Sequence, residues 1–463
     1  MKGREMVTRY IASIDVGTTN IKVNLFDAAY QLHATLSYPH LESLSTDEVF
    51  ELSFEEIWRN IVVAIKELIE TVKMSTLEIV LTTAMHSLQL LDENFVLVGG
   101  LVTWADKRGA AVIHAETADL KRAQYLRTGT PIHTMNPYYK LRALYQPGLK
   151  VASVKDLLFQ RLTGEWVLDK SNAAASGLLN IDSLTWDQAS LEAIGLTTDL
   201  LPKLVEIDYR SKALADLAGV GNADVQVSVT IGTSDGISSN YVFADLEKIA
   251  VLSIGTSHAV RVVHTSAQLN PDYQNFAYYI KPERYLVGLP SNNGADVLAW
   301  TNRIFDSSFD ELDQVAKLRP ATQSVFLPYL NGERAPLWDE SAVGHLLNLT
   351  RASSRESLLY SVILGMMFNI KHNVSLLAEL VDFEALGVVG GVMSLEAIPQ
   401  LLADVLGYTL YVPKLPNAET LGSIAVSKNI TFQGDYRVVT PDPAADFSDL
   451  YAGYLGMIKK VSV

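Results

Sequence analysis

The first strand-like run of the chain ends in groups that can bind phosphate and a divalent cation. Asp15 closes an apolar, β-branched run, Gly17, Thr18 and Thr19 follow it, and Lys22 adds a cation. Glycine lets backbone N–H groups approach a ligand closely, and such turns with hydroxyl groups beside them suit phosphate oxygens. An aspartate next to them can hold Mg²⁺ through water. The segment predicts a phosphate-binding turn, with Asp15 as the metal carboxylate.

The same pattern occurs again in the second half of the chain. Ile249 lies 238 positions after Ile11, and the run that it begins also leads into a glycine and two hydroxyl residues, with Gly255 and Thr256 in the turn. Another extended stretch follows each copy, so both predict a strand, a tight turn and a strand. A serine, Ser253, stands where the first copy has its aspartate. The second copy would therefore supply mainly phosphate donors.

Each hairpin opens one half of the chain, which predicts two related lobes. Helices are indicated by two capping boxes, Ser53 with Glu56 and Ser353 with Glu356, each followed by apolar residues at helical spacing. The mixture of strands and helices favours an α/β fold, and a length of 463 residues suits two or three domains. We expect one main boundary, between an N-terminal lobe of residues 1–245 and a C-terminal lobe of residues 246–463.

Asp235 lies where a strand-like run turns into a predicted helix. In one interpretation it accepts the proton of a substrate hydroxyl that attacks ATP. In another, residues 232–236 match Gly-x-Ser-x-Gly, the nucleophile elbow of serine hydrolases, with Ser234 as the nucleophile. The hydrolase interpretation lacks a His-Gly-Gly-Gly oxyanion segment and leaves the two hairpins unexplained. A catalytic base is therefore favoured, and a purely structural turn carboxylate is the third interpretation.

Composition argues against several classes of function. The formal net charge of −15 disfavours a nucleic-acid or anionic-membrane surface as the main partner. No cysteine is present, which removes disulfides, thiolate metal sites and cysteine nucleophiles. No apolar run approaches the ~18 residues of a membrane span, and no signal peptide is indicated. We expect a cytoplasmic enzyme, and the absence of a Gly-x-x-x-x-Gly-Lys-Ser/Thr segment argues against a P-loop protein.

The paired hairpins resemble the ATP-binding core of actin, the Hsp70 chaperones and sugar kinases. Over nearly the whole chain the sequence is similar to the FGGY family of carbohydrate kinases, in which the hairpins are the phosphate loops and Asp235 falls at the catalytic aspartate. Residues 326–338, 389–394 and 403–407 also resemble segments typical of this family. The resemblance implies two ribonuclease-H-like lobes with the active site in the cleft between them, and ATP and Mg²⁺ as cofactors.

The nucleotide site implied by the resemblance includes three glycines. Gly390 and Gly391 correspond to the glycine pair that lies against adenosine, and Gly294 to a nucleotide-contacting position. Ser394 is typical of a helix N-cap, which would point a helix N-terminus toward phosphate. In this arrangement Mg·ATP binds mostly on the second lobe and across both hairpins.

The sugar site is expected in the first lobe. His86 and Ser87 lie in a segment that resembles the xylulose and gluconate kinase branches, where a glycerol kinase would have an Arg-Glu pair. Trp104 would add an aromatic plane, Asp106 a carboxylate that recognises hydroxyl groups, and Arg108 a cation. The resemblance thus implies a small-molecule sugar or sugar acid as the substrate.

The substrate could be a sugar acid or a neutral ketose. Residues 104–108 and 332–339 look more like gluconate kinases than xylulokinases, and Arg108 or Lys107 could hold an aldonate carboxylate by charge-assisted hydrogen bonds. We therefore expect phosphorylation of gluconate to 6-phosphogluconate on a primary hydroxyl. A xylulokinase or other pentulose kinase is the alternative, and an actin-like or chaperone-like ATPase is the alternative from another class. A homodimer is compatible with these expectations.

Overall fold

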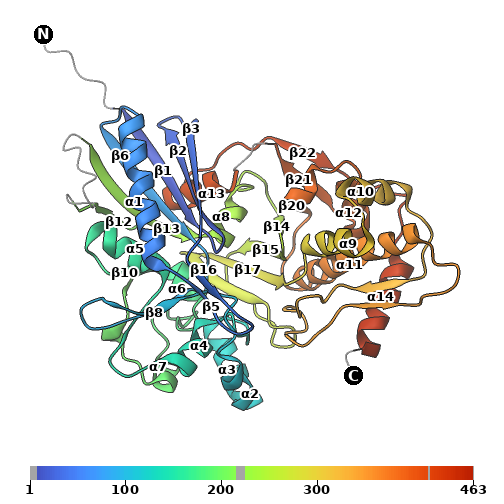
Figure 1. The fold of residues 1–463 in the computed structure, drawn as a ribbon, viewed down its shortest axis with the longest axis horizontal. Coiled ribbons are helices and arrows are strands. Elements are labelled where there is room, and N and C mark those ends of the chain that lie inside the picture. Colours follow the sequence, from blue (N-terminus) through green and yellow to red (C-terminus); the bar gives the residue numbers. More distant parts are fainter. Residues whose placement is uncertain (1–7, 215–224, 415–417, 462–463) are drawn as a thin grey trace, which may run out of the picture.

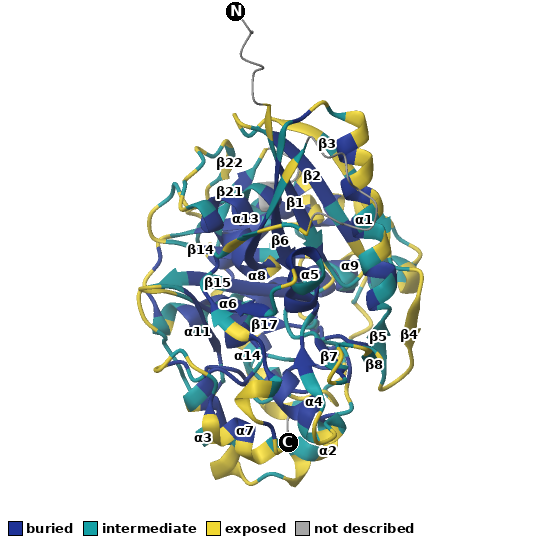
Figure 2. Ribbon diagram, turned by 90° about the vertical axis from the view of Figure 1, so that its left-hand side faces the viewer, coloured by how far each residue is buried: buried dark blue, intermediate teal, exposed yellow. Residues whose placement is uncertain are grey.

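The computed structural model describes residues 8–214, 225–414 and 418–461. Two lobes lie side by side, each built on one large mixed β-sheet (Figure 1). The strands of the first sheet fall between Arg9 and Ser234, and those of the second between Ile249 and Val439. The central strands of both sheets are buried (Figure 2).

The first sheet contains the hairpin predicted around Gly17. In spatial order its strands are β12 (Arg210–Lys212), β13 (Gln226–Ser234), β6 (Thr76–Thr83), β1 (Arg9–Val16), β2 (Asn20–Asp27) and β3 (Leu32–Pro39). Strands β1, β2 and β3 pair in antiparallel fashion, whereas β1 with β6, and β6 with β13, pair in parallel. The short β12 closes one edge by antiparallel pairing with β13.

The second sheet contains the second predicted hairpin. In spatial order its strands are β16 (Phe276–Lys281), β17 (Arg284–Ser291), β15 (His258–His264), β14 (Ile249–Ile254), β20 (Ala385–Val389), β21 (Thr409–Pro413) and β22 (Tyr436–Val439). Strands β14, β15 and β17 pair in antiparallel fashion, whereas β14 with β20, and β20 with β21, pair in parallel.

The two sheets share one topology. The order β3-β2-β1-β6-β13 in the first matches β17-β15-β14-β20-β21 in the second, with the same change from antiparallel to parallel pairing. This is the strand arrangement of a ribonuclease-H-like lobe. The prediction of two related lobes, each opened by the same hairpin, is confirmed.

Helices α1 (Phe54–Thr71) and α5 (Val154–Thr163) pack on one face of the first sheet and share its apolar core. Ser53 caps α1 as predicted, since its side chain accepts a hydrogen bond from Glu56 N at 3.2 Å. The other elements of this half are β4 (Ser43–Ser45), β5 (Phe50–Leu52), β7 (Leu88–Leu91), β8 (Leu97–Val102), α2 (Ala110–Ala115), α3 (Ala118–Thr128), α4 (Pro137–Leu144), β9 (Lys150–Ala152), β10 (Val167–Asp169), α6 (Lys170–Ala174), α7 (Gln188–Ile194), η1 (Thr198–Leu200) and β11 (Lys203–Val205).

A larger helical layer covers one face of the second sheet and shares a single apolar core with it. The helices and turns of this part are α9 (Asp296–Phe305), α10 (Phe309–Leu318), α11 (Arg355–Leu380), η2 (Gly391–Ser394), α12 (Ile398–Leu406) and α14 (Ser448–Val461), and the strands β18 (Val325–Leu327) and β19 (His345–Leu347) form a small separate sheet. Helix α11 is capped by Ser354 with Ser357, one residue after the predicted pair. Within the described residues, none of the helices is both long and apolar enough to cross a bilayer.

The prediction that Ser394 caps a helix is wrong. Its hydroxyl donates to Gly391 O at 2.8 Å inside the short turn η2, and α12 begins only at Ile398. The carboxylate of Asp313 accepts the N–H groups of Ala397 and Ile398, each at 2.9 Å. A side chain from another helix therefore satisfies the start of α12.

Two helices cross between the lobes. Helix α8 (Asp235–Tyr241) follows β13 of the first sheet yet contacts β14 and β15 of the second, whereas α13 (Ala418–Lys428) follows β21 of the second sheet yet packs on β1, β6 and β13 of the first. They also pack on each other. A Cβ atom added at Gly422 would lie 2.0 Å from Ser238 O, so the two backbones touch at a glycine.

We predict that Gly422→Ala destabilises the protein by about 1–3 kcal/mol, because the added methyl group forces α8 and α13 apart. Gly453→Ala in α14 is the matched control. A Cβ there meets no atom within 4 Å, so replacing an exposed helical glycine should be neutral or stabilise by up to ~1 kcal/mol. Urea unfolding of both variants measures the difference, and equal stability of the two would contradict the close crossing.

Candidate active site

The first hairpin turn is closed by Gly17 N–H, which donates to Asn20 O at 3.0 Å. Asp15 and Lys22 lie opposite each other in the β1–β2 register. The predicted phosphate-binding side chains of this hairpin are partly or fully accessible, namely Asp15, Thr18, Thr19 and Lys22. The turn can therefore present both backbone and hydroxyl groups to a ligand.

The second hairpin turn packs against the segment that contains Gly294. Gly294 N–H donates to Thr256 O at 2.9 Å, and Ala295 N–H donates to Gly255 O at 2.7 Å. A Cβ atom at Gly294 would lie 2.5 Å from the backbone of Ser257, so only glycine permits this approach. The structure thus brings together Gly255, Thr256 and Gly294, which the sequence placed at the nucleotide.

Gly390 and Gly391 come directly after β20, beside the end of β14. Gly390 has a φ of 140°, and a Cβ atom on it would lie 2.1 Å from Ile254 O. A Cβ atom on Gly391 would meet no atom within 4 Å, so its backbone is open to a ligand. Because Ile254 precedes the second turn, the glycine pair adjoins the predicted phosphate site.

Asp15 and Asp235 line one pocket of about 240 Å³, together with Ser253 and Arg261 of the second hairpin. Thr82 also lines it, and its buried Oγ1 has no hydrogen-bond partner among the described residues. Mg²⁺ prefers oxygen ligands and is usually held by one or two carboxylates together with substrate phosphates. This set of side chains fits that pattern. The described residues contain no cluster of three His, Asp or Glu side chains that would hold a metal by protein groups alone.

Asp235 is accessible within the cleft, although protein groups surround it. This partial loss of hydration raises the pKa of its carboxyl above the usual value, while the charge of Arg261 and the N–H of Gly236, which donates at 2.7 Å, oppose the shift. A carboxylate with a raised pKa is a better proton acceptor than an ordinary aspartate. Asp235 therefore has the accessibility and basicity that a general base needs.

Ser234 does not have the surroundings of a serine nucleophile. Its Oγ is buried, and no described residue forms a hydrogen bond with it. A nucleophilic serine needs a base within hydrogen-bond reach and access to the substrate. The geometry therefore gives no support to the hydrolase interpretation.

A β-bulge shapes the strand that leads to Asp235. The pairing of β13 with β6 is interrupted between Thr230 and Thr233, where Gly232 has a φ of 68°. Such a bulge leaves backbone groups without ladder partners. Lys155 replaces them, since its fully buried Nζ donates to the carbonyl oxygens of Leu81 at 3.0 Å, Ile231 at 2.8 Å and Thr233 at 2.7 Å.

Burial lowers the pKa of Lys155 to about 8, and the nearby carboxylates of Asp169, Asp15 and Asp235 limit the shift. Sequence reasoning did not find this residue. The only signal was a charged side chain within the apolar face of a helix.

The predicted sugar segment lies beside Asp235. A Cβ atom added at Gly236 would lie 2.3 Å from the methyl group of Met85, which precedes His86. Nδ1 of His86 lies 2.7 Å from Ala175 O, which leaves Nε2 as an acceptor. Burial, with Lys140 and Arg334 nearby, lowers the pKa of His86 to about 3, so this imidazole is neutral at pH 7.

Trp104 and Ser87 line one small cavity with Thr18 of the first turn, which joins the predicted sugar and phosphate residues. The other two predicted sugar ligands, however, are occupied within the protein. Asp106 is fully buried and accepts from Phe50 N at 3.1 Å and from Arg108 Nε at 2.9 Å. Arg108 also pairs with Glu51 at 2.5 Å. Ser87 Oγ accepts a hydrogen bond from the backbone N–H of residue 154 at 3.1 Å but still has its own proton to donate.

Arg334, which sequence reasoning left unassigned, reaches the same place from the second lobe. Its guanidinium carbon lies 5.6 Å from the centre of the Trp104 ring, and Nη2 donates to Ser291 O at 2.7 Å. Nε is buried and has no hydrogen-bond partner among the described residues. The signal for it was present, because Arg334 lies in the family-like segment 326–338.

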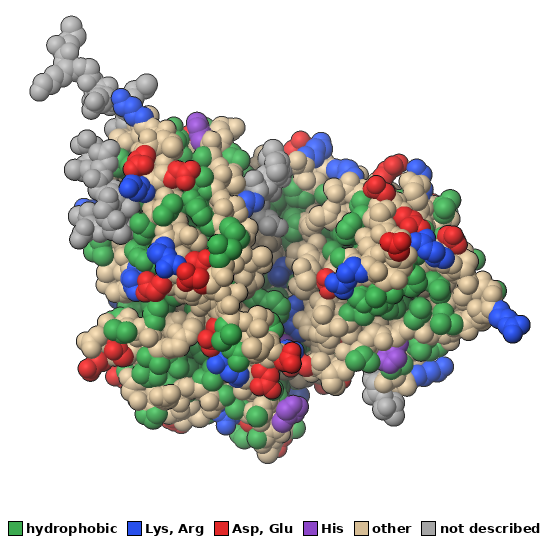
Figure 3. Space-filling view, in the orientation of Figure 1, with side chains coloured by type: hydrophobic (Ala, Val, Ile, Leu, Met, Phe, Trp, Pro, Cys, Tyr) green, Lys and Arg blue, Asp and Glu red, His purple; other side chains and the backbone are tan. Residues whose placement is uncertain are grey.

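Lys140 adds to the positive potential around Arg334, whereas the nearby His133 does not. Lys140 Nζ is fully buried, donates to Met135 O at 3.2 Å and also contacts Thr103 O. Burial lowers the pKa of Lys140 to about 7, although Asp106 and Glu340 oppose the shift. Burial and the charge of Arg334 also hold the pKa of His133 well below its usual value. The surface of the molecule is hollowed between the lobes, and Lys or Arg side chains are visible in the hollow (Figure 3).

Two family models match the chain. Residues 10–241 match the N-terminal domain of the FGGY family of carbohydrate kinases, and residues 250–427 match the C-terminal domain of the same family.

Individual relatives agree with these matches. A gluconokinase of Bacillus subtilis (strain 168) is 30% identical over 451 residues, which cover 90% of this chain and 86% of the relative. A glycerol kinase of Thermococcus gammatolerans is 25% identical, with coverage of 90% and 88%. Among solved structures, a gluconate kinase and a ligand-bound xylulose kinase, both from Lactobacillus acidophilus, are each 27% identical with a TM-score of 0.92. Each of these alignments covers 98% of this chain and 99% of the other.

We predict that Lys155→Met lowers the free energy of unfolding by about 3 kcal/mol, because three buried carbonyl groups lose their donor. Lys317→Met is the control, since Lys317 forms a surface ion pair with Glu396 worth ~0–1 kcal/mol. Chemical denaturation of both variants measures the two losses. A loss for Lys155→Met as small as that of the control would show that the bulge does not need the ammonium group.

Proposed function

We propose that this chain, which belongs to the FGGY family of carbohydrate kinases, phosphorylates gluconate on its primary hydroxyl with ATP and yields 6-phosphogluconate. The family membership supports phosphoryl transfer to a carbohydrate. The half-buried cation Arg334 supports the choice of a sugar acid, because an aldonate carries a carboxylate that a neutral ketose lacks.

Arg334 is a better candidate for that carboxylate than the cation first expected. Arg108 is already paired with Asp106 and Glu51, so a substrate carboxylate would have to compete with two protein carboxylates. Arg334 Nε, in contrast, has no such partner within the described part of the chain. A guanidinium held over Trp104 is fixed in orientation, which favours a charge-assisted hydrogen bond to a carboxylate.

In the proposed reaction, Asp235 accepts the proton of the substrate hydroxyl while that oxygen attacks the terminal phosphate of ATP. The hydroxyl is positioned by the Met85–His86 segment, which touches Gly236 next to the base. Neutral His86 can accept a hydrogen bond from a sugar hydroxyl through Nε2, and Trp104 can cover an apolar face of the sugar. Positioning and electrostatics supply most of the rate in such reactions.

The nucleotide is proposed to bind along the second lobe. Gly390 and Gly391 would lie against adenosine, while Gly294, Gly255 and Thr256 contact the phosphates. Thr18, Thr19 and Lys22 of the first hairpin close on the terminal phosphate, and Asp15 would hold Mg²⁺. Mg²⁺, when bound, neutralises phosphate charge, and Arg261 lies where it can do the same.

Two further expectations accompany this proposal. A cytoplasmic location can be tested by cell fractionation, and a homodimer by sedimentation equilibrium. Phosphorylation of a ketose is the second candidate activity, because a xylulose kinase structure is as similar as the gluconate kinase structure.

We predict that Asp235→Asn lowers kcat by ~10²–10⁴-fold and leaves ATP binding intact, because the amide cannot accept the hydroxyl proton. Asp449→Asn, an exposed position in α14, is the matched control and should retain wild-type turnover. A coupled assay of ADP release measures kcat, and calorimetry measures ATP binding. Near-normal turnover of Asp235→Asn would remove the base assignment.

Sugar-independent ATP turnover with filament formation or client binding would favour the actin-like or chaperone-like class.

We predict that gluconate gives the highest kcat/KM in a panel that also contains D-xylulose, L-ribulose, L-fuculose and glycerol. Arg334→Met should raise the KM for gluconate by ~10–100-fold with a smaller effect on the KM for ATP, because a charge-assisted hydrogen bond is lost. Lys107→Met, at an exposed neighbour of Asp106, should change neither value much. Preference for a neutral ketose, or an Arg334→Met variant with unchanged KM, would contradict the sugar-acid assignment.

A further inference from the structure

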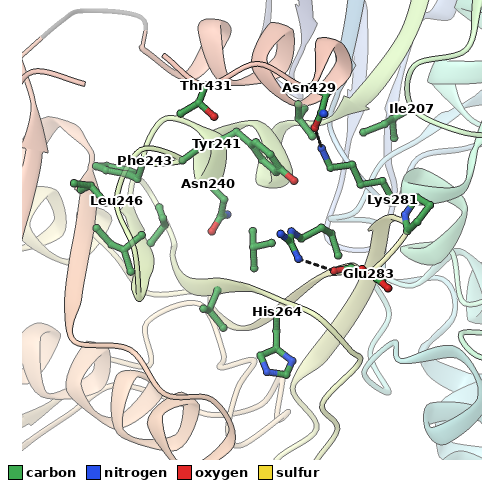
Figure 4. A pocket seen from close by; sticks show the side chains of 18 of the residues that line it. Ile207, Asn240, Tyr241, Phe243, Leu246, His264, Lys281, Glu283, Asn429 and Thr431 are labelled. Carbon is green, nitrogen blue, oxygen red and sulfur yellow. Dashed lines mark hydrogen bonds between the residues drawn. The ribbon is translucent and has the colours of Figure 1, made fainter. Parts of the chain in front are cut away.

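A second and larger cavity, of about 980 Å³, lies away from Asp235 (Figure 4). It is bounded by the start of β14, the end of β15, the tip of the β16–β17 hairpin and residues 206–208 of the first half of the chain. The second hairpin turn, which contains Gly255 and Thr256, lies at the other end of β14 and β15. Both ends of the same strands therefore carry a cavity.

The two crossing helices connect this cavity to the active site. Helix α8 begins at Asp235 in the catalytic pocket and ends at Tyr241 in the large cavity. Helix α13 follows the same course, with Thr420 in the catalytic pocket and Val426 and Ser427 in the large cavity. Since the backbones touch at Gly422, the two helices pack closely between the catalytic pocket and the large cavity.

The walls of the cavity suit a small anion with a carbon skeleton. Its floor is apolar and includes the buried side chains of Phe243, Val251 and Val262. Its volume lies within the ~300–1,000 Å³ of typical ligand sites. Two cations, Lys281 and Arg284, stand on the hairpin tip at its rim. The cavity thus offers apolar contact and positive charge together.

Neither cation has a carboxylate partner within hydrogen-bond distance in the described residues. Lys281 Nζ donates to the neutral Asn429 Oδ1 at 2.9 Å and lies 5.4 Å from the centre of the Tyr241 ring, and Arg284 Nη1 donates to Glu283 O at 3.0 Å. Burial and the charge of Arg284 lower the pKa of Lys281, and only Asp208 acts against this.

Other charged residues also line the cavity. Asp208, Glu283 and Asp382 contribute carboxylates, and in the described residues none of them forms an ion pair with Lys281 or Arg284. Glu206 pairs with Lys170 and accepts from Tyr279 OH at 3.0 Å, and Lys248, at another part of the rim, pairs with Glu384. Lys281 and Arg284 repel each other and have no ion-pair partner in the described residues, so the space between them is where an anion would bind in this chain of net charge −15.

We propose that this cavity is a regulatory site for a small phosphorylated metabolite, whose phosphate binds between Lys281 and Arg284 and whose carbon skeleton lies on the apolar floor. Bound there, the metabolite joins the hairpin tip of the second lobe, the end of α13 and residues 206–208. It thereby favours one relative position of the helix pair, and so of Asp235. The metabolite can shift the equilibrium between the two helix positions only as far as its affinities for those positions differ. Binding itself does not depend on the proposed substrate, whereas the kinetic effect rests on the proposed kinase activity.

Calorimetry of the full chain tests binding, with the active site filled by gluconate and a non-hydrolysable ATP analogue. Inorganic phosphate and 3-phosphoglycerate are the probes. The wild type should bind 3-phosphoglycerate more tightly than phosphate, and the Lys281→Met/Arg284→Met double variant should bind it at least ~10-fold more weakly. The control is Lys317→Met/Arg351→Met, two surface positions outside the cavity, with wild-type affinity expected. If the double variant does not fold, Lys281→Gln should show part of the loss.

Absence of binding of both probes, or equal affinity of wild type and cavity variants, would overturn the site. The regulatory effect is tested separately by the KM for gluconate with and without 3-phosphoglycerate. We expect a shift in the wild type and none in the double variant, whose basal activity should match the wild type. Binding without any kinetic shift would overturn the coupling, while failure to phosphorylate gluconate at all would refute the proposed function and leave the binding result standing.

Discussion

The contact between α8 and α13 links the two lobes. Each helix follows a strand of one sheet and packs on the other sheet, and the two backbones meet where Gly422 leaves no side chain in the way. Because Asp235 begins α8, the position of the proposed base relative to the phosphate turns depends on this crossing. The close packing thus links the architecture of the fold to the geometry needed for phosphoryl transfer.

Electrostatics in the cleft oppose the charge of the whole chain. The chain carries a formal net charge of −15, yet the cleft collects Arg334, Lys140, Arg261 and Lys155, of which Lys140 and Lys155 are fully buried. Burying these cations is costly, and the cost is offset by carbonyl acceptors, as for Lys155, or by an aromatic ring, as for Arg334. Such an arrangement attracts anionic substrates locally while the acidic exterior keeps nonspecific polyanions away.

Features that depend on local sequence were predictable, and features that depend on distant partners were not. The two hairpins and the cap at Ser53 involve residues within a few positions of each other, so spacing alone revealed them. Asp313 caps α12 from 83 to 85 positions away, and Lys155 serves carbonyl groups exposed by a bulge in another strand. Likewise, Arg108 looked like a free cation until its two carboxylate partners were placed beside it.

The exchange of α13 between the lobes also limits how such proteins can be rearranged in evolution. Residues 1–245 include every strand of the first sheet but lack α13, which covers Ile11, Phe26 and Val80 on that sheet. A gene fragment cut between the two halves would therefore encode a first lobe with an uncovered apolar face. Recombination between relatives would preserve a working lobe only if the segment that encodes α13 travelled with the first half, so the two halves must be inherited together.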